Sequence, residues 1–403
     1  MIRRLLRSPP FALAWLVGLF EEVAYFLLVN VPGKLLDLGV SEAGIGLAYS
    51  AGALATLLLR PLFGRLLDQA HRRTVLRYLG FATSLATVLL GVIDEIGVVL
   101  WLAFLAQRIL QMILFTTLLT YVADALPVSM RTQGLAVFGV SGLLPIALSN
   151  LLGDALRVGA GYDGVIFASA AAGLISWLLA WRLPLLPIAV HEPRRSFWAV
   201  VQQRNLLPLW WVTLAIAMGM EAILTFMRPF VETRGVISLG VFFAVYGFAA
   251  ISARFGAGGL SAILGERVTI ALAVAGQAAG VILLAFASGP TLAAIGAVAA
   301  GSAHGLVFPI LSSQVVQRAR AAERGSAVVT FTATFDVGLL IVAPIVGLLI
   351  ADAGYTVGFG TLGVTLLLGG LGYLVLDRRF SETPMGDRLG ADLATSSEPT
   401  DRS

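Results

Sequence analysis

Carboxyl groups inside long apolar stretches are the strongest chemical signal in this sequence. Glu21 and Glu22 lie in the middle of the first such stretch, and Glu221 lies in a later one. Inserting an ionisable side chain into the lipid core costs about 2.5–3.5 kcal/mol on insertion scales, so each of these groups needs a compensating role. A buried carboxyl group can exchange a proton for a cation or for a change of conformation. The pattern therefore predicts a polar cavity lined by carboxylates.

Helix geometry distinguishes the two adjacent glutamates. Neighbouring residues point about 100° apart around an α-helix, so Glu21 and Glu22 cannot face one cavity equally. The sequence leaves open which of them does. An alternative is that one of the two forms a structural ion pair with Arg108, which lies in another apolar stretch, and never titrates.

Two further ionisable groups extend the predicted proton-coupling set. His304 carries an imidazole, the group that titrates most readily near neutral pH, although a lone histidine in a membrane helix is often only hydrogen-bonded to a neighbour. Asp336 begins a glycine-rich segment and either joins the proton path or closes a gate. From the residues alone, the set is Glu21, Glu22, Glu221, His304 and Asp336.

Aromatic and polar side chains in the same stretches are candidate substrate ligands. The aromatic members can line a hydrophobic cavity, whereas the alternative is that they contact lipid or neighbouring helices. The predicted substrate-binding residues are Tyr25, Gln111, Phe226, Arg228 and Tyr246.

The composition places these residues in a membrane protein. The chain has 403 residues, of which 58% are hydrophobic and only 12% charged, and its mean hydropathy is +0.91. A soluble protein cannot cover its surface with so few charges. The net charge of +4 is therefore no sign of a nucleic-acid partner. The sequence has no cysteine, which excludes disulfides and thiolate metal sites; we expect no metal and no cofactor.

The apolar stretches predict an all-α membrane protein of twelve transmembrane helices in two groups of six. A spanning helix needs about 20 apolar residues. The stretches lie near 11–31, 43–63, 74–93, 97–122, 134–153, 162–183, 206–227, 237–258, 268–287, 291–314, 325–350 and 355–376. We expect an N-terminal half over 1–183, a central cytoplasmic linker over 184–205, a C-terminal half over 206–380 and a disordered cytoplasmic tail over 381–403.

The distribution of positive charge predicts the orientation. Most of the 27 Lys and Arg residues fall in the segments on one side of the predicted bundle. The other side carries only Lys34, Arg157, Arg228 and Arg234. Because cytoplasmic loops are enriched in Lys and Arg, both termini are expected in the cytoplasm, in a multi-pass protein of the cell membrane.

The segment between the second and third stretches has a definite order of residues. A glycine lets two helix ends approach closely, an aspartate can hold a neighbouring helix, and an arginine pair anchors that face at the membrane surface. These residues are Gly64, Asp68, Arg72 and Arg73, with Leu66 and Leu76 between and after them. Here the chain resembles the major facilitator superfamily of secondary transporters, whose hallmark loop has this pattern; Gln69 and His71 depart from it.

Weaker matches support the same resemblance and an internal repeat. The segment from Gly258 to Arg267 repeats the hallmark loop in the second group, with Gly258 at the position of Gly64 and Ala262 in place of the aspartate. Arg131 before the fifth stretch corresponds to Arg324 before the eleventh, and Pro145 corresponds to Pro344. The predicted gating and structural residues are Gly64, Asp68, Arg72, Arg73, Arg131, Pro145 and Pro344.

The fourth stretch resembles the family's arginine-containing motif. Leu105, Arg108 and Gln111 match it, with Met112 in place of the final glycine. The resemblance implies that Arg108 assists proton coupling, so Arg108 joins that set. The glycine-dense signature of drug antiporters is only partly present in the fifth stretch, where Ser149 and Asn150 replace glycines.

The resemblance implies a transporter that works by alternating access rather than an enzyme. We expect proton-coupled export of a small cationic or amphipathic compound by a monomer, with the proton motive force as the source of free energy. One alternative is a proton-coupled symporter that imports a small metabolite. An alternative of another class is a non-transporting membrane sensor, although the short tail leaves little room for an output domain.

Overall fold

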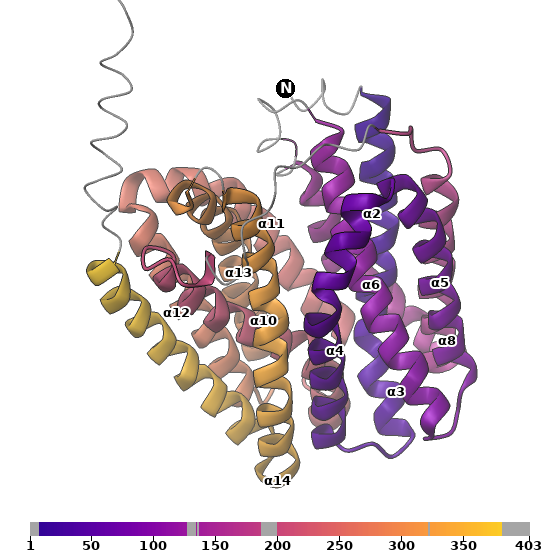
Figure 1. Cartoon of the computed structure of the whole chain (residues 1–403). Coiled ribbons are helices and arrows are strands. Elements are labelled where there is room, and N and C mark those ends of the chain that lie inside the picture. The colour runs from indigo at the N-terminus through magenta and orange to yellow at the C-terminus, as the bar shows by residue number, and fades with distance from the viewer. Residues whose placement is uncertain (1–7, 127–133, 135–136, 187–199, 321–322, 381–403) are drawn as a thin grey trace, which may run out of the picture.

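The secondary structure of the described residues is helical (Figure 1). The computed structural model describes residues 8–126, 134, 137–186, 200–320 and 323–380, with the side chains of 64–69 and 324–325 also outside the description. The elements are α2 (Pro9–Leu27), η1 (Leu28–Asn30), α3 (Val31–Asp37), α4 (Glu42–Gln69), α5 (Arg72–Val92), α6 (Val98–Asp124), α8 (Val140–Ala180), α10 (Leu207–Arg234), α11 (Leu239–Leu264), α12 (Glu266–Ala285), α13 (Pro290–Arg318) and α14 (Arg324–Phe380).

The predicted membrane fold is confirmed, and two glycines explain how ten long helices supply twelve spans. Within the described ranges, ten helices are long and apolar enough to cross a membrane. Helix α8 has 41 residues, about 60 Å at 1.5 Å per residue, which is twice the thickness of the lipid core. Gly161 (φ 65°) divides α8, and Gly354 (φ 81°) divides the 57-residue α14. Glycine adopts this positive φ without a Cβ clash.

One predicted loop is helical. The second span ends at Phe63, as the sequence predicted, but Gly64 and Asp68, which were expected in a loop, belong to α4, which continues to Gln69. The residues after Gly64 are mostly good helix formers, so nothing stops the helix until His71, whose backbone is extended. Arg131, most of the 184–205 linker and the 381–403 tail lie outside the described residues.

The helices pack as two groups, which we call the N-half (α2–α8) and the C-half (α10–α14). Figure 1 shows the indigo-to-magenta N-half beside the pink-to-yellow C-half. In the N-half, α2 packs on α8, and α5 packs on α6 and α8. In the C-half, α10 packs on α14, and α13 packs on α11 and α12. The halves meet chiefly along α4 with α14 and along α8 with α11.

The apolar cores show that the two halves are joined more tightly at one side of the bundle. We call the side where α2 begins and α14 ends the terminal side, and the other the opposite side. A core that includes Leu143, Phe243 and Val346 contains residues of both halves. Nearer the terminal side the core divides: Phe11, Leu118 and Tyr121 belong to the N-half alone.

The C-half has its own separate core on the terminal side, which includes Leu209, Leu311 and Phe331. Because buried apolar contact is the main attraction between packed helices, this division indicates that apolar contacts join the halves mainly on the opposite side.

Close packing of α13 on α11 depends on a glycine. A Cβ added at Gly305 would overlap the carbonyl oxygen of Ala250. We therefore expect Gly305→Ala to lower the free energy of unfolding by about 1–3 kcal/mol, because the helices must move apart. Gly259→Ala in α11 is the matched control, because a Cβ there meets open space. Thermal unfolding in detergent, followed by tryptophan fluorescence, compares the two; equal midpoints would contradict the expectation.

Candidate functional site

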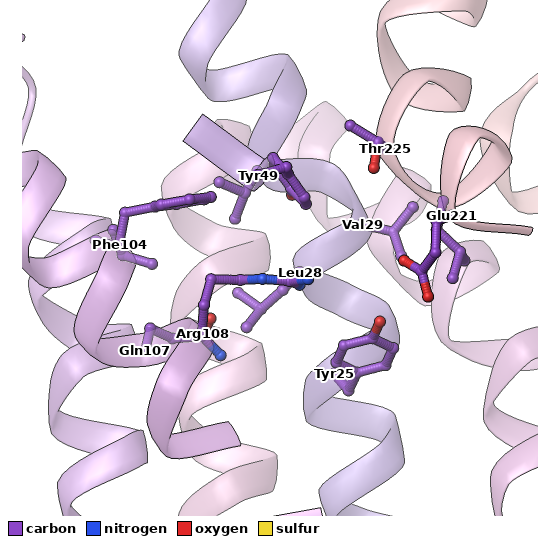
Figure 2. A pocket seen from close by; sticks show the side chains of 12 residues that line it. Tyr25, Leu28, Val29, Tyr49, Phe104, Gln107, Arg108, Glu221 and Thr225 are labelled. Atoms are coloured by element: carbon purple, nitrogen blue, oxygen red, sulfur yellow. The ribbon is translucent and has the colours of Figure 1, made fainter. Parts of the chain in front are cut away.

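A cavity with an empty volume of about 430 Å³ lies where the N-half faces α10. This volume includes space that is open to solvent. Its walls combine aromatic, aliphatic and charged side chains, as Figure 2 shows. The lining residues are Tyr25, Leu28, Val29, Val31, Tyr49, Leu90, Phe104, Gln107, Arg108, Glu221, Leu224 and Thr225.

Arg108 brings a permanent positive charge to this cavity. Gln107 and Arg108 follow Phe104 by three and four residues on α6, so each lies near Phe104 on the helix surface, and all three line the cavity. The guanidinium carbon of Arg108 lies 4.8 Å from the centre of the Tyr49 ring. A guanidinium over an aromatic face is a favourable cation–π contact. No ion pair joins Arg108 to a carboxylate in the described part of the chain.

Glu221 brings a carboxyl group from the other half. It shares one face of α10 with Leu224 and Thr225, and Figure 2 shows its side chain reaching toward the cavity from the side opposite Arg108. Neither a hydrogen bond nor an ion pair engages this carboxyl group among the described residues. The structure thus brings together Tyr25, Arg108 and Glu221 from the predicted site set.

The two adjacent glutamates of α2 point in different directions. Glu21 is buried, and Gln111 Nε2 donates a hydrogen bond to its Oε1 at 3.1 Å. Glu22 is three residues before Tyr25, so the two share one face of α2, and Tyr25 lines the cavity. The geometry therefore favours Glu22 as the member nearer the cavity. The alternative of an ion pair with Arg108 is not seen for either glutamate within the described ranges.

Three other predicted residues lie away from the cavity walls. The hydroxyl of Tyr246 and Nδ1 of His304 are 3.0 Å apart, where α11 contacts α13. Phe226 is fully buried in the core shared by both halves. Their predicted roles in substrate binding and proton coupling remain predictions, since the geometry gives each of them a packing or hydrogen-bonding partner instead of a cavity position.

Arg228, predicted to bind substrate, belongs to an ionic cluster on the opposite side. Its side chain is only 2% exposed, and Nη1 lies 3.2 Å from Asp154 Oδ1 of α8 and 3.3 Å from Glu232 Oε1. Asp154 also accepts a hydrogen bond from the backbone N–H of Gly240, at 2.7 Å. Tyr162 donates to Glu232, at 2.9 Å. This cluster connects the N-half to α10 and α11 of the C-half.

On the terminal side, Arg60 of α4 crosses to α14. It donates to the hydroxyl of Thr332 at 3.0 Å and forms an ion pair with Asp336. Asp336, predicted to couple protons or to gate, is therefore partnered across the halves. Within the N-half, Arg72 pairs with Asp124 at 3.4 Å, whereas Nε of Arg73 has no hydrogen-bond partner among the described residues.

The remaining gating predictions rest on backbone positions. Pro145 lies inside α8 and Pro344 lies inside α14. Pro344 packs against Gly46 of α4, and a Cβ added at Gly46 would collide with the carbonyl oxygen of Ala343. The side chains of Gly64 and Asp68, and all of Arg131, lie outside the description.

Sequence reasoning missed several residues that the structure places at these sites. Tyr49 and Gln107 line the cavity, but neither carries a charge that would mark it within an apolar stretch. Asp154 and Arg60 carried such a signal, because both are charged and lie at the edge of predicted spans. Their cross-half partners could not be identified from spacing, because the partners belong to helices far away in the sequence.

Comparison with known proteins gives a consistent family. The sequence profile described as Major Facilitator Superfamily matches residues 11–328 and 209–394. An MFS-type transporter of Pseudomonas aeruginosa is 27% identical over 390 residues, covering 91% of this chain and 94% of that protein. The MFS-type transporter YhhS of Escherichia coli (strain K12) is 26% identical over 364 residues, covering 85% of this chain and 86% of YhhS.

Solved structures show the same fold. The peptide transporter POT superposes with a TM-score of 0.78 at 12% identity, covering 92% of this chain and 94% of that one. The nucleoside transporter NupG gives 0.75 at 12% identity, with 91% and 99% covered. A bacterial homologue of the human lysosomal transporter Spinster gives 0.74 at 14% identity, with 94% and 99% covered. At these identities the likeness concerns the fold alone.

Proposed function

The chain belongs to the major facilitator superfamily, and from this premise we propose that it exports a small cationic or amphipathic compound in exchange for protons. It is a multi-pass membrane protein of a secondary transporter family. The observation that carries the proposal is the position of Glu221. Its carboxyl group reaches a cavity between the halves that Arg108 enters from the other side.

The position of the cavity suits alternating access. A site between two bundles becomes accessible from either membrane face when the bundles rock against each other. Glu221 belongs to the C-half and Arg108 to the N-half. Rocking therefore changes the distance between a titratable carboxyl group and a fixed charge, and Coulomb interactions in a water-poor site depend strongly on that distance. This arrangement supports coupling between proton binding and the conformational change.

We place the protein in the cell membrane with both termini in the cytoplasm, because Lys and Arg concentrate in the segments of the terminal side. The terminal side then faces the cytoplasm, and the structure corresponds to a state closed on the outer side. We propose a monomer that uses the proton motive force and needs no cofactor, with a small molecule and the lipid bilayer as its partners and without nucleic acid.

Import by proton symport is the second candidate, and one observation favours it. The fifth span carries Asn150 where the antiporter signature has glycine. Asn150 Oδ1 accepts a hydrogen bond from Nδ2 of Asn30 at 3.3 Å. The side chain of residue 150 therefore connects η1 with α8, a role that a glycine could not have. Export remains the primary proposal, because the carboxylates and the cavity do not depend on this position.

Transport in everted membrane vesicles tests the proposal and its direction. Respiration acidifies the vesicle interior, and the dye acridine orange reports the pH gradient. If the protein is an exporter, tetraphenylphosphonium, ethidium or an amphipathic amino acid should accumulate inside the vesicles and partly dissipate the pH gradient. Both effects should occur only in vesicles that contain the protein. Depletion of a preloaded compound would establish the symporter instead. Uptake that persists after the gradient is collapsed with an uncoupler would contradict proton coupling.

A further inference from the structure

We propose that the compound bound in the central cavity is a small zwitterion, with its anionic group on Arg108 and its cationic group on Glu221. This inference rests on the proposed transport function and specifies the substrate class of the same site. It narrows the expected cationic or amphipathic compound to one that carries both charges. Arg108 and Glu221 are the two charged residues among those that line the cavity, and neither has an ion-pair partner among the described residues.

Five largely buried cations elsewhere in the described part of the chain have carboxylate partners. Lys34 contacts Asp163 at 2.6 Å, Arg228 contacts Asp154 and Glu232, and Arg318 contacts Asp377 at 2.7 Å. Arg60 and Arg72 are paired as well. Leaving a charge unpaired in a water-poor site is costly, so pairing is expected wherever the charge has only a structural role.

Arg108 departs from this pattern. It reaches the cavity, its guanidinium lies over the Tyr49 ring, and no carboxylate of the described chain pairs with it. A guanidinium cannot lose its charge in a protein, and its planar donors match a carboxylate or phosphonate with two parallel hydrogen bonds. An anionic group of a bound compound would supply the missing partner.

Glu221 is the complementary case on the other half. Its carboxyl group faces the same cavity without an ion-pair partner in the described ranges. The charged and titratable groups around it are Arg108 on α6, Asp336 on α14, and the hydroxyls of Tyr25, Tyr49 and Tyr246. Asp336 is already paired with Arg60. A cationic group of the compound is therefore the partner that Glu221 lacks.

The other side chains that line the cavity are mostly aromatic or aliphatic. Tyr25, Tyr49, Phe104, Leu28 and Leu224 form walls that favour an aromatic or branched aliphatic group. A compound with only a positive charge would approach the guanidinium of Arg108 with no compensation, which is unfavourable at low dielectric constant. A zwitterion compensates both charges at once and connects the N-half with the C-half.

The same arrangement explains exchange with protons. A carboxylate binds an ammonium group only while it is ionised, so a proton and the cationic group compete for Glu221. Binding of the zwitterion displaces the proton, and protonation releases the zwitterion. Competition for one site is the simplest way to couple the two fluxes in opposite directions.

Matched compounds that differ only in charge test the inference. The probes are phenylalanine and leucine as zwitterions, their methyl esters as cations, and their N-acetyl forms as anions. Binding to the purified full chain in detergent is measured from the thermal unfolding midpoint at one constant pH, over a range of probe concentrations. We expect the zwitterions to raise the midpoint and the esters and N-acetyl forms to bind at least about tenfold more weakly, since each lacks one charge-assisted contact.

The variants Arg108→Gln and Arg254→Gln make the test specific. Arg254 of α11 has no carboxylate partner among the described residues and does not line the cavity. Stabilisation by zwitterions should be lost in Arg108→Gln and kept in Arg254→Gln. Two results would overturn the inference: esters that stabilise wild type and Arg108→Gln equally, or no stabilisation by either zwitterion.

Binding at constant pH needs no proton gradient, so the two proposals can fail separately. Zwitterion binding without gradient-driven transport in vesicles would overturn proton coupling and keep the substrate class. Gradient-driven transport of cations alone would do the reverse.

Discussion

Glu221→Gln is expected to reduce gradient-driven accumulation in everted vesicles to the level of vesicles that lack the protein. Glutamine keeps the size of the side chain but can neither bind a proton as a carboxylate does nor attract a cation. The cavity position of Glu221, opposite Arg108, makes this carboxyl group the one whose loss removes coupling most completely. The measurement is initial uptake of the compound that wild type moves best in the vesicle panel.

Two further variants serve as controls for Glu221→Gln. Glu221→Asp keeps a carboxyl group and should retain part of the gradient dependence. Glu266→Gln, in the first turn of α12 and not among the cavity-lining residues, should transport as wild type does. Undiminished gradient-driven uptake by Glu221→Gln, at equal amounts of protein in the membrane, would show that coupling uses another group, with Glu22 the next to test.

Arg228→Met is expected to destabilise the protein by about 3 kcal/mol. Removing one partner of a buried ion pair costs about 3–5 kcal/mol, because the other charge stays buried and unpaired. We expect the lower end of this range, because both carboxylates keep another hydrogen bond in the variant. Asp154 still accepts one from the N–H of Gly240, and Glu232 still accepts one from the hydroxyl of Tyr162. Tryptophan fluorescence during thermal unfolding in detergent measures the shift in the midpoint.

Arg157→Met is the matched control at the same cluster. Arg157 also approaches Glu232, at 3.5 Å, but its side chain is 38% exposed, against 2% for Arg228. A solvent-exposed pair contributes only about 0–1 kcal/mol, so this variant should unfold close to the wild-type midpoint. Equal shifts for both variants would mean that the burial of Arg228 does not determine its contribution.

Loss of Arg228 should also change which side of the bundle opens. The Arg228–Asp154 ion pair joins the two halves on the opposite side. The native chain has no cysteine, so a single Leu224→Cys substitution reports access to the cavity wall. A membrane-impermeant maleimide applied to intact cells should label this cysteine faster when Arg228→Met is also present. Unchanged labelling would show that other contacts keep that side closed.

The amino-acid order determined the class of this protein and its inventory of charges. Hydropathy is a local property, and a helix that spans lipid must be long and apolar wherever it packs, so the spans and the family were readable before any contact was known. The rarity of charge in such stretches identified Glu21, Glu22, Arg108 and Glu221 in the same way.

Only the tertiary structure decided how these charges are used. Side-chain direction and packing showed that Glu21 bonds to Gln111, whereas Glu22 shares the face of Tyr25. Arg228 is neutralised by Asp154, and Arg108 is not neutralised by any carboxylate of the described chain. Ion pairing depends on distances of a few ångströms between helices far apart in the sequence. No spacing along one chain contains that information, so the packing of the two halves is what distinguishes a structural charge from one available to a ligand.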